Sequence, residues 1–216
     1  MARPHLNDEE RSLRRAQLLA AARELFDASR ELPSVAAIAE AAGVAKGSVY
    51  LSFASKEEIF IALLEDSFTS LLGVVVPALG ALPRQAGAAA EQFSTLYAQA
   101  VAANPHLLPL AGMTNAVLEK NLPVPAMLAF KNGLARGLDM AASALSQSRL
   151  GVDRAKGIDL LLRTWSLTLG LWQTLDFPVE LRSHLRRAPL SVFDRDFTSE
   201  LRQAVCALWV GSLSRR

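Results

Sequence analysis

Apolar residues recur every three or four positions along most of this chain, and this spacing constrains its fold more strongly than any other feature. On an α-helix, residues with that spacing share one face, which another element must cover. The pattern is clear at residues 18–26 and 197–208, and no segment alternates as a half-buried strand does. Ala and Leu, which both favour helix, supply most of the apolar side chains. We therefore predict an all-α fold.

Capping residues and breakers divide the chain into helices. Asn7 and Glu10 have capping-box spacing at the start of a first helix, and Ser34 can cap a short second helix. Ser55 with Glu58 forms another capping box. After Pro77 we expect a loop of Gly, Pro and Ala that reaches residue 87. Beyond the second helix, helices are predicted at about 45–53, 56–76, 88–103, 106–121, 125–148, 154–176 and 194–213.

Residues 34–60 contain the most specific pattern. Two short amphipathic helices joined by Ala42-Gly43-Val44 are typical of a helix-turn-helix, whose second helix enters the major groove of DNA. A glycine between two short helices also occurs in ordinary helix hairpins, so the turn alone does not decide. The outward residues favour DNA, because Lys46 can meet a phosphate or a guanine edge and Gly47 permits close backbone approach.

Three further side chains in this segment suit contacts with DNA. Ser48 is a small hydroxyl near the helix start, and Tyr50 offers both a ring and a hydroxyl. Lys56 lies at the N-terminus of the following helix, where exposed amides are a natural phosphate site. The combination of these residues at fixed spacing predicts DNA binding.

The chain resembles the TetR family over about residues 12–66, and the segment at 34–60 resembles the family's signature. An apolar first helix at residues 18–26 precedes the signature. The matching residues are Ile38-Ala39, Ala42-Gly43-Val44, Gly47-Ser48-Val49-Tyr50, Phe53 and Ser55-Lys56-Glu57-Glu58. The resemblance implies a DNA-binding domain at residues 1–55 and a ligand-binding and dimerisation domain at residues 56–216. The helix at about 56–76 would link the two.

The resemblance also implies roles for individual residues. Tyr50 and Lys56 would contact phosphates, and arginines such as Arg14 and Arg15 would approach the flanking backbone or the minor groove. The residues expected to face the bases are Lys46, Ser48 and Ser52.

Two positions depart from the family's pattern. Ala45 replaces a Ser that often caps the recognition helix. Leu51-Ser52 stands where an aromatic residue or His often follows the Tyr. Base reading at that end is therefore expected either to be weak or to rest on an apolar contact of Leu51 with a thymine methyl.

The predicted helices at 154–176 and 194–213 carry the widest apolar surfaces. The first is apolar nearly all round, so it has to be covered on more than one side. The resemblance implies that both helices pair with a second copy in a four-helix interface, although the same surface could pack inside one subunit. A homodimer would place two recognition helices on a palindromic operator. The expected interface residues are Leu160, Leu167, Leu171, Phe197, Leu201, Val205 and Leu208.

The resemblance further implies a pocket for a small-molecule effector in the larger domain. The candidate lining mixes apolar bulk with few polar groups, which favours an apolar or aromatic effector, although each residue could belong to the core instead. The candidates are Phe93, Tyr97, Met113, Asn115, Met127, Phe130, Trp165, Thr168 and Trp172.

The alternative to a regulator is an enzyme or a plain helical binding protein. His5, His106 and His184 lack metal-ligand spacing, and no phosphate loop or nucleophile elbow occurs. We expect no catalytic residue, metal or cofactor. The single Cys206 suits the reducing cytoplasm, residues 1–17 do not resemble a signal peptide, and the apolar stretches are interrupted short of a membrane span.

Charge does not decide the function. Net charge is +2, and residues 1–60 hold eight Lys or Arg against nine Asp or Glu. Repression is expected only as the family's commonest mode, because no residue decides between repressor and activator.

Overall fold

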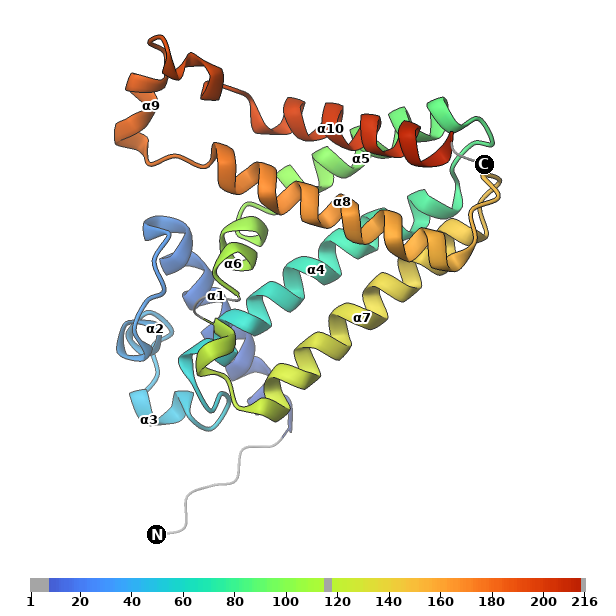
Figure 1. Ribbon diagram of the computed structural model, residues 1–216. Helices are drawn as coiled ribbons and strands as arrows, with labels where there is room; N and C mark the ends of the chain where they lie inside the picture. Colours follow the sequence, from blue (N-terminus) through green and yellow to red (C-terminus); the bar gives the residue numbers. More distant parts are fainter. Residues whose placement is uncertain (1–7, 115–117, 215–216) are drawn as a thin grey trace. The chain divides into compact units, whose positions relative to one another are not determined.

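The computed structural model describes residues 8–114 and 118–214, and every regular element within them is helical, as predicted. The chain runs through α1 (Asp8–Ser29), α2 (Val35–Ala41), α3 (Lys46–Val49), α4 (Lys56–Gly80), α5 (Ala86–Ala102), α6 (Leu107–Met113), η2 (Glu119–Asn121), α7 (Val124–Ser146), α8 (Arg154–Leu175), α9 (Val179–Leu185), η3 (Leu190–Phe193) and α10 (Phe197–Leu213) (Figure 1).

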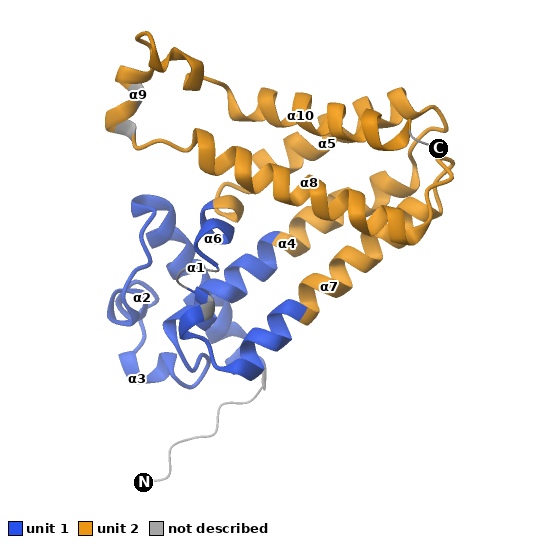
Figure 2. Cartoon of the chain, in the orientation of Figure 1, with its two compact units in different colours: residues 1–67, 109–131 blue, residues 68–108, 132–216 orange. Residues whose placement is uncertain are grey.

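Two compact units make up the chain (Figure 2). The first combines Met1–Ser67 with Pro109–Lys131, and the second combines Phe68–Leu108 with Asn132–Arg216. The first unit therefore continues beyond residue 55 into α4 and includes a segment from the middle of the chain. The proposed boundary between a DNA-binding domain at 1–55 and a second domain at 56–216 stays a prediction.

Side-chain caps start several helices. Ser34 Oγ accepts the Ala37 amide at 3.1 Å, as predicted for α2, and Ser55 Oγ accepts the Glu58 amide at 3.3 Å. The Glu58 carboxylate then accepts the Ala54 amide at 2.7 Å, so it reaches one residue further back than in an ordinary capping box. Asn7, the predicted cap of α1, lies outside the described residues.

Two predicted boundaries are wrong. Helix α3 spans only Lys46–Val49, because no side chain caps it at Ala45 and the backbone passes into turns after Tyr50. Helix α4 continues through Pro77 to Gly80, where we expected a loop. The proline ring would crowd the carbonyl four residues earlier. That residue is Gly73, and both positions are exposed, so solvent can satisfy the displaced carbonyl.

The later helices agree with the predicted segments except in two places. The helix predicted at 106–121 is interrupted, since α6 ends at Met113 and only η2 follows. No helix was predicted between α8 and α10, yet this stretch contains α9 and η3. Both elements are short, and short helices give weak periodic signals because few residues repeat on one face.

Helix α4 also bears on the question of a membrane. Among the described helices, it is the one that is long and apolar enough to cross a bilayer. We had expected every apolar stretch to be interrupted short of a membrane span. Half of its apolar window is buried inside the chain, a pattern also found in the core helices of soluble proteins.

An aromatic stack forms the centre of the second unit, where α10 lies against α5 and α8 (Figure 1). The Phe93 ring stacks on Trp209 with 3.9 Å between centroids and on Tyr97 with 5.4 Å. Two hydroxyls of α8 bind the polar edges of this stack. Thr168 Oγ1 lies 3.0 Å from Tyr97 Oη, and Thr164 Oγ1 accepts Trp209 Nε1 at 3.0 Å. The three helices are thus joined by packing and by buried hydrogen bonds.

We predict that Thr164→Val destabilises the protein by roughly 1–3 kcal/mol, because it leaves the buried indole N–H of Trp209 without its acceptor. Urea unfolding would measure the loss. Thr174→Val is the matched control, since Thr174 makes the same type of bond to the carbonyl four residues back on α8 but is exposed. Equal stability of the two variants would contradict the prediction.

Candidate nucleic-acid interface

The turn between α2 and α3 requires its glycine. Gly43 has a φ of +66°, a conformation that costs other residues energy because of their Cβ. Its amide donates to the Glu40 carbonyl at 3.0 Å, and the Val44 amide donates to the Ala39 carbonyl at 2.9 Å. These bonds end α2 and set the direction in which α3 leaves. The glycine turn predicted from the sequence is confirmed.

The segment from α3 to α4 has one buried side and one exposed side. Val49 and Phe53 are 1% and 2% exposed, as their spacing predicted. On the other side, Tyr50 is 52% exposed and Leu51 is 67% exposed. Half or more of the surface of each of these two large side chains lies outside the core of the first unit. They are therefore available to a partner of this chain.

The smaller and charged candidates lie on the same segment. Lys46 and Gly47 are exposed, and Ser48 and Ser52 are half-buried. A Cβ added to Gly47 would meet nothing within 4 Å, so the chain itself does not require glycine there. Because packing within the chain does not explain the glycine, close approach of a binding partner to the backbone at this position is consistent with it.

The start of α4 is partly occupied by the protein's own groups. Ser55 Oγ accepts one amide of the first turn, and the Glu58 carboxylate accepts the amide of Ala54. A carboxylate in this position reduces the attraction of the helix N-terminus for a phosphate. Binding of an anion here would then depend on the Lys56 side chain, which is half-buried.

Arg15 makes a contact that the sequence did not predict. Its guanidinium lies 4.3 Å from the centroid of the Phe53 ring, and its Nη1 donates to the Ser52 carbonyl at 3.5 Å. A cation held over an aromatic ring keeps its other N–H groups free to donate outward. The contact therefore fixes an exposed positive charge beside Ser52 and Phe53, just after α3. Arg14 and Arg15 both belong to α1.

The predicted effector residues are divided between the two units, and their role as the lining of one pocket stays a prediction. Phe93, Tyr97 and Thr168 belong to the buried stack, where burial raises the pKa of Tyr97 to about 12. Trp165 packs edge-on against Phe68 with 5.0 Å between centroids. Met113, Met127 and Phe130 belong to the first unit, and Asn115 lies outside the described residues.

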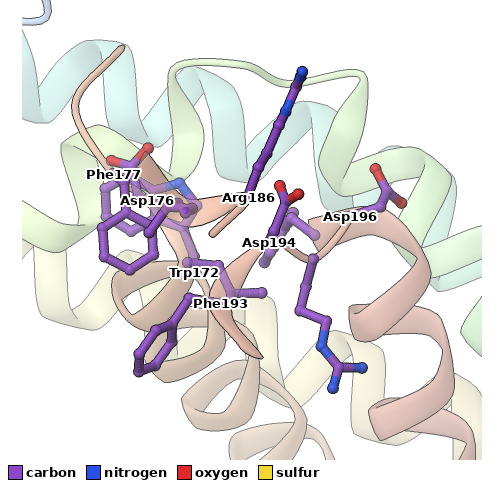
Figure 3. Close-up of a pocket in the computed structure, with 11 residues that line it drawn as sticks. Trp172, Asp176, Phe177, Arg186, Phe193, Asp194 and Asp196 are labelled. Carbon is purple, nitrogen blue, oxygen red and sulfur yellow. The ribbon is translucent and has the colours of Figure 1, made fainter. Parts of the chain in front are cut away.

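Trp172 has a different setting. It lines a pocket of about 430 Å³ at the end of α8, together with residues of α9, η3 and the start of α10 (Figure 3). This pocket was not predicted from the sequence. The sequence pattern that could have indicated the pocket is the clustering of Phe177, Phe193 and Phe197 with three aspartates around them.

The predicted dimer residues fall into two groups. Leu160, Leu201 and Val205 are at most 1% exposed, since they pack inside this chain. Leu167, Leu171, Phe197 and Leu208 are half-buried and retain some accessible surface. The large apolar side chains that are exposed on α8 and α10 are Leu162 and Val210. They share no position with the predicted set, because periodicity identifies an apolar stripe but not the neighbour that covers it.

The described residues hold no group of three or more potential metal-binding His, Cys, Asp or Glu side chains. Cys206 is half-buried, and burial together with Glu91, whose Oε2 lies 3.4 Å from the sulfur, raises the pKa of the thiol. The reactive thiolate is thereby disfavoured. His5 lies outside the described residues.

Two family profiles match the sequence. One, described as bacterial regulatory proteins of the tetR family, matches residues 18–63. The other, described as the tetracyclin repressor-like C-terminal domain, matches residues 68–216. The chain belongs to the TetR family. It is therefore a transcriptional regulator with a DNA-binding helix-turn-helix, as the residues at 34–60 predicted.

Solved structures of other TetR-type regulators share the fold. The TetR family regulator PfmR from Thermus thermophilus is 18% identical, with 89% of this chain and 96% of that chain covered and a TM-score of 0.55. The fatty acid degradation regulator FadR from Bacillus halodurans is 17% identical, with 94% and 97% covered and a TM-score of 0.58.

FadR from Bacillus subtilis, solved in complex with stearoyl-CoA, is also 17% identical, with 91% and 98% covered and a TM-score of 0.57. A search of curated protein sequences finds no match. At these identities the solved structures establish the fold of this TetR-family chain, and its own ligands have to be argued from its own residues.

Two glycines of the helix-turn-helix should respond oppositely to alanine. Gly43→Ala should destabilise the protein by about 1–2 kcal/mol, because the added Cβ is strained at positive φ. Gly47→Ala should stabilise it by about 0.5–1 kcal/mol, because the site is helical and open. Thermal or urea unfolding of both variants would measure the difference, and shifts of the same sign would disprove this account of the turn.

Proposed function

We propose that this TetR-family regulator is a repressor, released from a palindromic operator by a small apolar or aromatic effector. The observation that carries the proposal is the two-sided segment around α3. Val49 and Phe53 anchor it in the first unit, while Tyr50 and Leu51 project from the opposite side. A short helix anchored on one side and free on the other suits the reading of base edges in a major groove.

The proposed contacts with DNA divide into two classes. Tyr50, Lys56 and Arg15 hold phosphates, which sets affinity for any sequence. Arg14 contributes charge to the same flank of the operator. The side chains that read bases are Lys46, Ser48, Leu51 and Ser52, with Gly47 allowing the backbone to come close.

A palindromic operator requires two copies of the recognition helix related by a two-fold axis. We propose that α8 and α10 form the dimer interface. Leu162 and Val210 are 52% and 39% exposed in the single chain, and a second copy would cover them. Of the residues predicted from sequence, Leu167, Leu171, Phe197 and Leu208 keep accessible surface for the same contact. Leu160, Leu201 and Val205 would support it from below.

The effector is proposed to be apolar or aromatic and to bind in the larger domain. The stearoyl-CoA complex of the Bacillus subtilis protein supports the general idea that this fold can hold a ligand with an apolar chain. The effector would have to prefer a dimer whose recognition helices are wrongly spaced for the operator. Helix α4 is the proposed lever, since it belongs to both units without interruption between Lys56 and Gly80.

As a regulator of this kind the protein would act in the cytoplasm without catalysis, metal or cofactor. The raised pKa of the Cys206 thiol supports a structural role for that residue.

The DNA-binding proposal predicts two classes of variant. Tyr50→Phe and Lys56→Gln should weaken binding to all sequences alike, by about three- to tenfold at moderate salt. Lys46→Gln and Ser48→Ala should change which sequence is preferred, because each lost base contact is worth roughly 1–3 kcal/mol of discrimination. Selection from a random DNA pool, followed by fluorescence anisotropy at several salt concentrations, would measure both effects.

Arg84→Gln provides the control for this experiment, since Arg84 is exposed and belongs to the second unit. If the wild-type protein formed no salt-sensitive, sequence-preferring complex, the regulator proposal would fail. If all four variants lost affinity uniformly, only the division into phosphate and base contacts would be wrong.

For the effector, thermal-shift screening of apolar and aromatic compounds should yield ligands that raise the unfolding temperature, because a ligand of the native state stabilises it. Each such compound should also weaken the complex with operator DNA. A compound that stabilises the protein and leaves DNA affinity unchanged would count against an inducer.

A further inference from the structure

The connection between α8 and α10 builds a pocket whose walls are unusually aromatic. Its volume is about 430 Å³, and all its lining residues belong to the second unit. Trp172, Phe177, Phe193 and Phe197 contribute the rings, and Leu185, 7% exposed, is a buried apolar residue of the lining. The pocket shares no residue with the buried stack of Phe93, and Trp172 is its only member among the predicted effector residues that the structure describes.

The rings are positioned by contacts with each other. Phe177 and Phe193 meet edge to face, with 5.9 Å between centroids and an angle of 63° between planes. Phe193 nonetheless remains 39% exposed, although it is a large apolar side chain. Figure 3 shows Trp172, Phe177 and Phe193 gathered at one side of the pocket. Aromatic faces carry partial negative charge, so they attract a cation placed against them.

The charged residues of the lining favour the same kind of ligand. Asp176, Asp194 and Asp196 are opposed by Arg186 and Arg195. Two of these groups are already engaged, because Arg195 pairs with Glu200 at 3.1 Å and Asp196 accepts the Ser199 amide at 2.7 Å to cap α10.

The remaining groups leave an excess of negative charge. Among the side chains that the structure describes, the carboxylates of Asp176 and Asp194 have neither an ion pair nor a hydrogen bond, and Arg186 is the remaining described basic residue of the lining. Figure 3 shows the Arg186 side chain extending away from the rings. An anion would meet both carboxylates, and a neutral apolar ligand would gain nothing from them.

We propose that this pocket binds a small hydrophobic cation, an aryl- or alkylammonium compound whose charge faces Asp176 and Asp194 and whose apolar part lies against Trp172 and Phe193. The site shares no residue with the DNA-contacting segment around α3 or with the buried stack, and it shares only Phe197 with the residues named for the dimer interface. It does not rest on the proposed repressor function, since binding here can be measured without DNA.

Isothermal titration of the full-length protein with three matched compounds tests the proposal. Benzyltrimethylammonium is the cation, 2,2-dimethyl-3-phenylpropan-1-ol is the neutral analogue and 2,2-dimethyl-3-phenylpropanoate is the anion. We expect the cation to bind about tenfold more tightly than the neutral compound, through attraction to the carboxylates and rings, and the anion not to bind. Equal affinity of the cation and the neutral analogue, or no binding of the cation, would overturn the proposal.

Substitutions of pocket residues test whether the cation binds at this site. Asp176→Asn combined with Asp194→Asn should weaken the cation about tenfold and reduce its preference over the neutral analogue, because the amides keep the shape and lose the charge. Trp172→Leu should weaken the cation similarly by removing a ring face. Asp159→Asn is the matched control, since Asp159 is an exposed acid near the opposite end of α8.

Asp159, Asp176 and Asp194 all occupy exposed positions, so these variants should fold, and unfolding curves would verify that. If Asp159→Asn weakened the cation as much as the double variant, the attraction would be a general effect of net charge and the pocket would not be its source. Unchanged affinity in the double variant would exclude these carboxylates directly.

Discussion

The burial of Phe53 is the interaction on which the DNA-contacting part of the molecule depends. Its ring is 2% exposed, and the Arg15 guanidinium covers it from α1. Helix α3 has a single turn and no side-chain cap, so its own backbone cannot hold it in place. Anchoring through Val49 and Phe53 provides that support and at the same time forces Tyr50 and Leu51 outward. The burial of Val49 and Phe53 therefore both stabilises α3 and exposes the side chains that would contact DNA.

A different kind of anchor organises the second unit. There, Phe93 stacks between Tyr97 and Trp209, and two threonines of α8 satisfy the polar edges of those rings. Buried polar groups with complete hydrogen bonding specify one arrangement of helices, because any other leaves a donor or acceptor unpaired. The stack also accounts for residues that composition alone made candidates for an effector pocket. Large aromatic side chains with a few hydroxyls suit a ligand site and a well-satisfied core equally.

The sequence alone predicted more of the first unit than of the second. The Gly43 turn, the Ser34 cap and the inward positions of Val49 and Phe53 were all predictable, because each follows from spacing over a few neighbouring residues. The contact between Arg15 and Ser52 was not, since 37 positions separate them. In the second unit the apolar stripes of α8 and α10 were identified, but Leu160, Leu201 and Val205 turned out to face the interior of the chain.

By itself, the sequence determined that this protein is all-helical, that it carries a helix-turn-helix and that it belongs with the TetR regulators. Those conclusions depend on local spacing, which the chain retains in any arrangement of its helices. Only the tertiary structure decided that α4 continues through Pro77, that the aromatic stack is closed, and that Trp172 lines a pocket together with Asp176 and Asp194. These depend on which surfaces meet across long stretches of chain, and a residue's type does not reveal what will cover it.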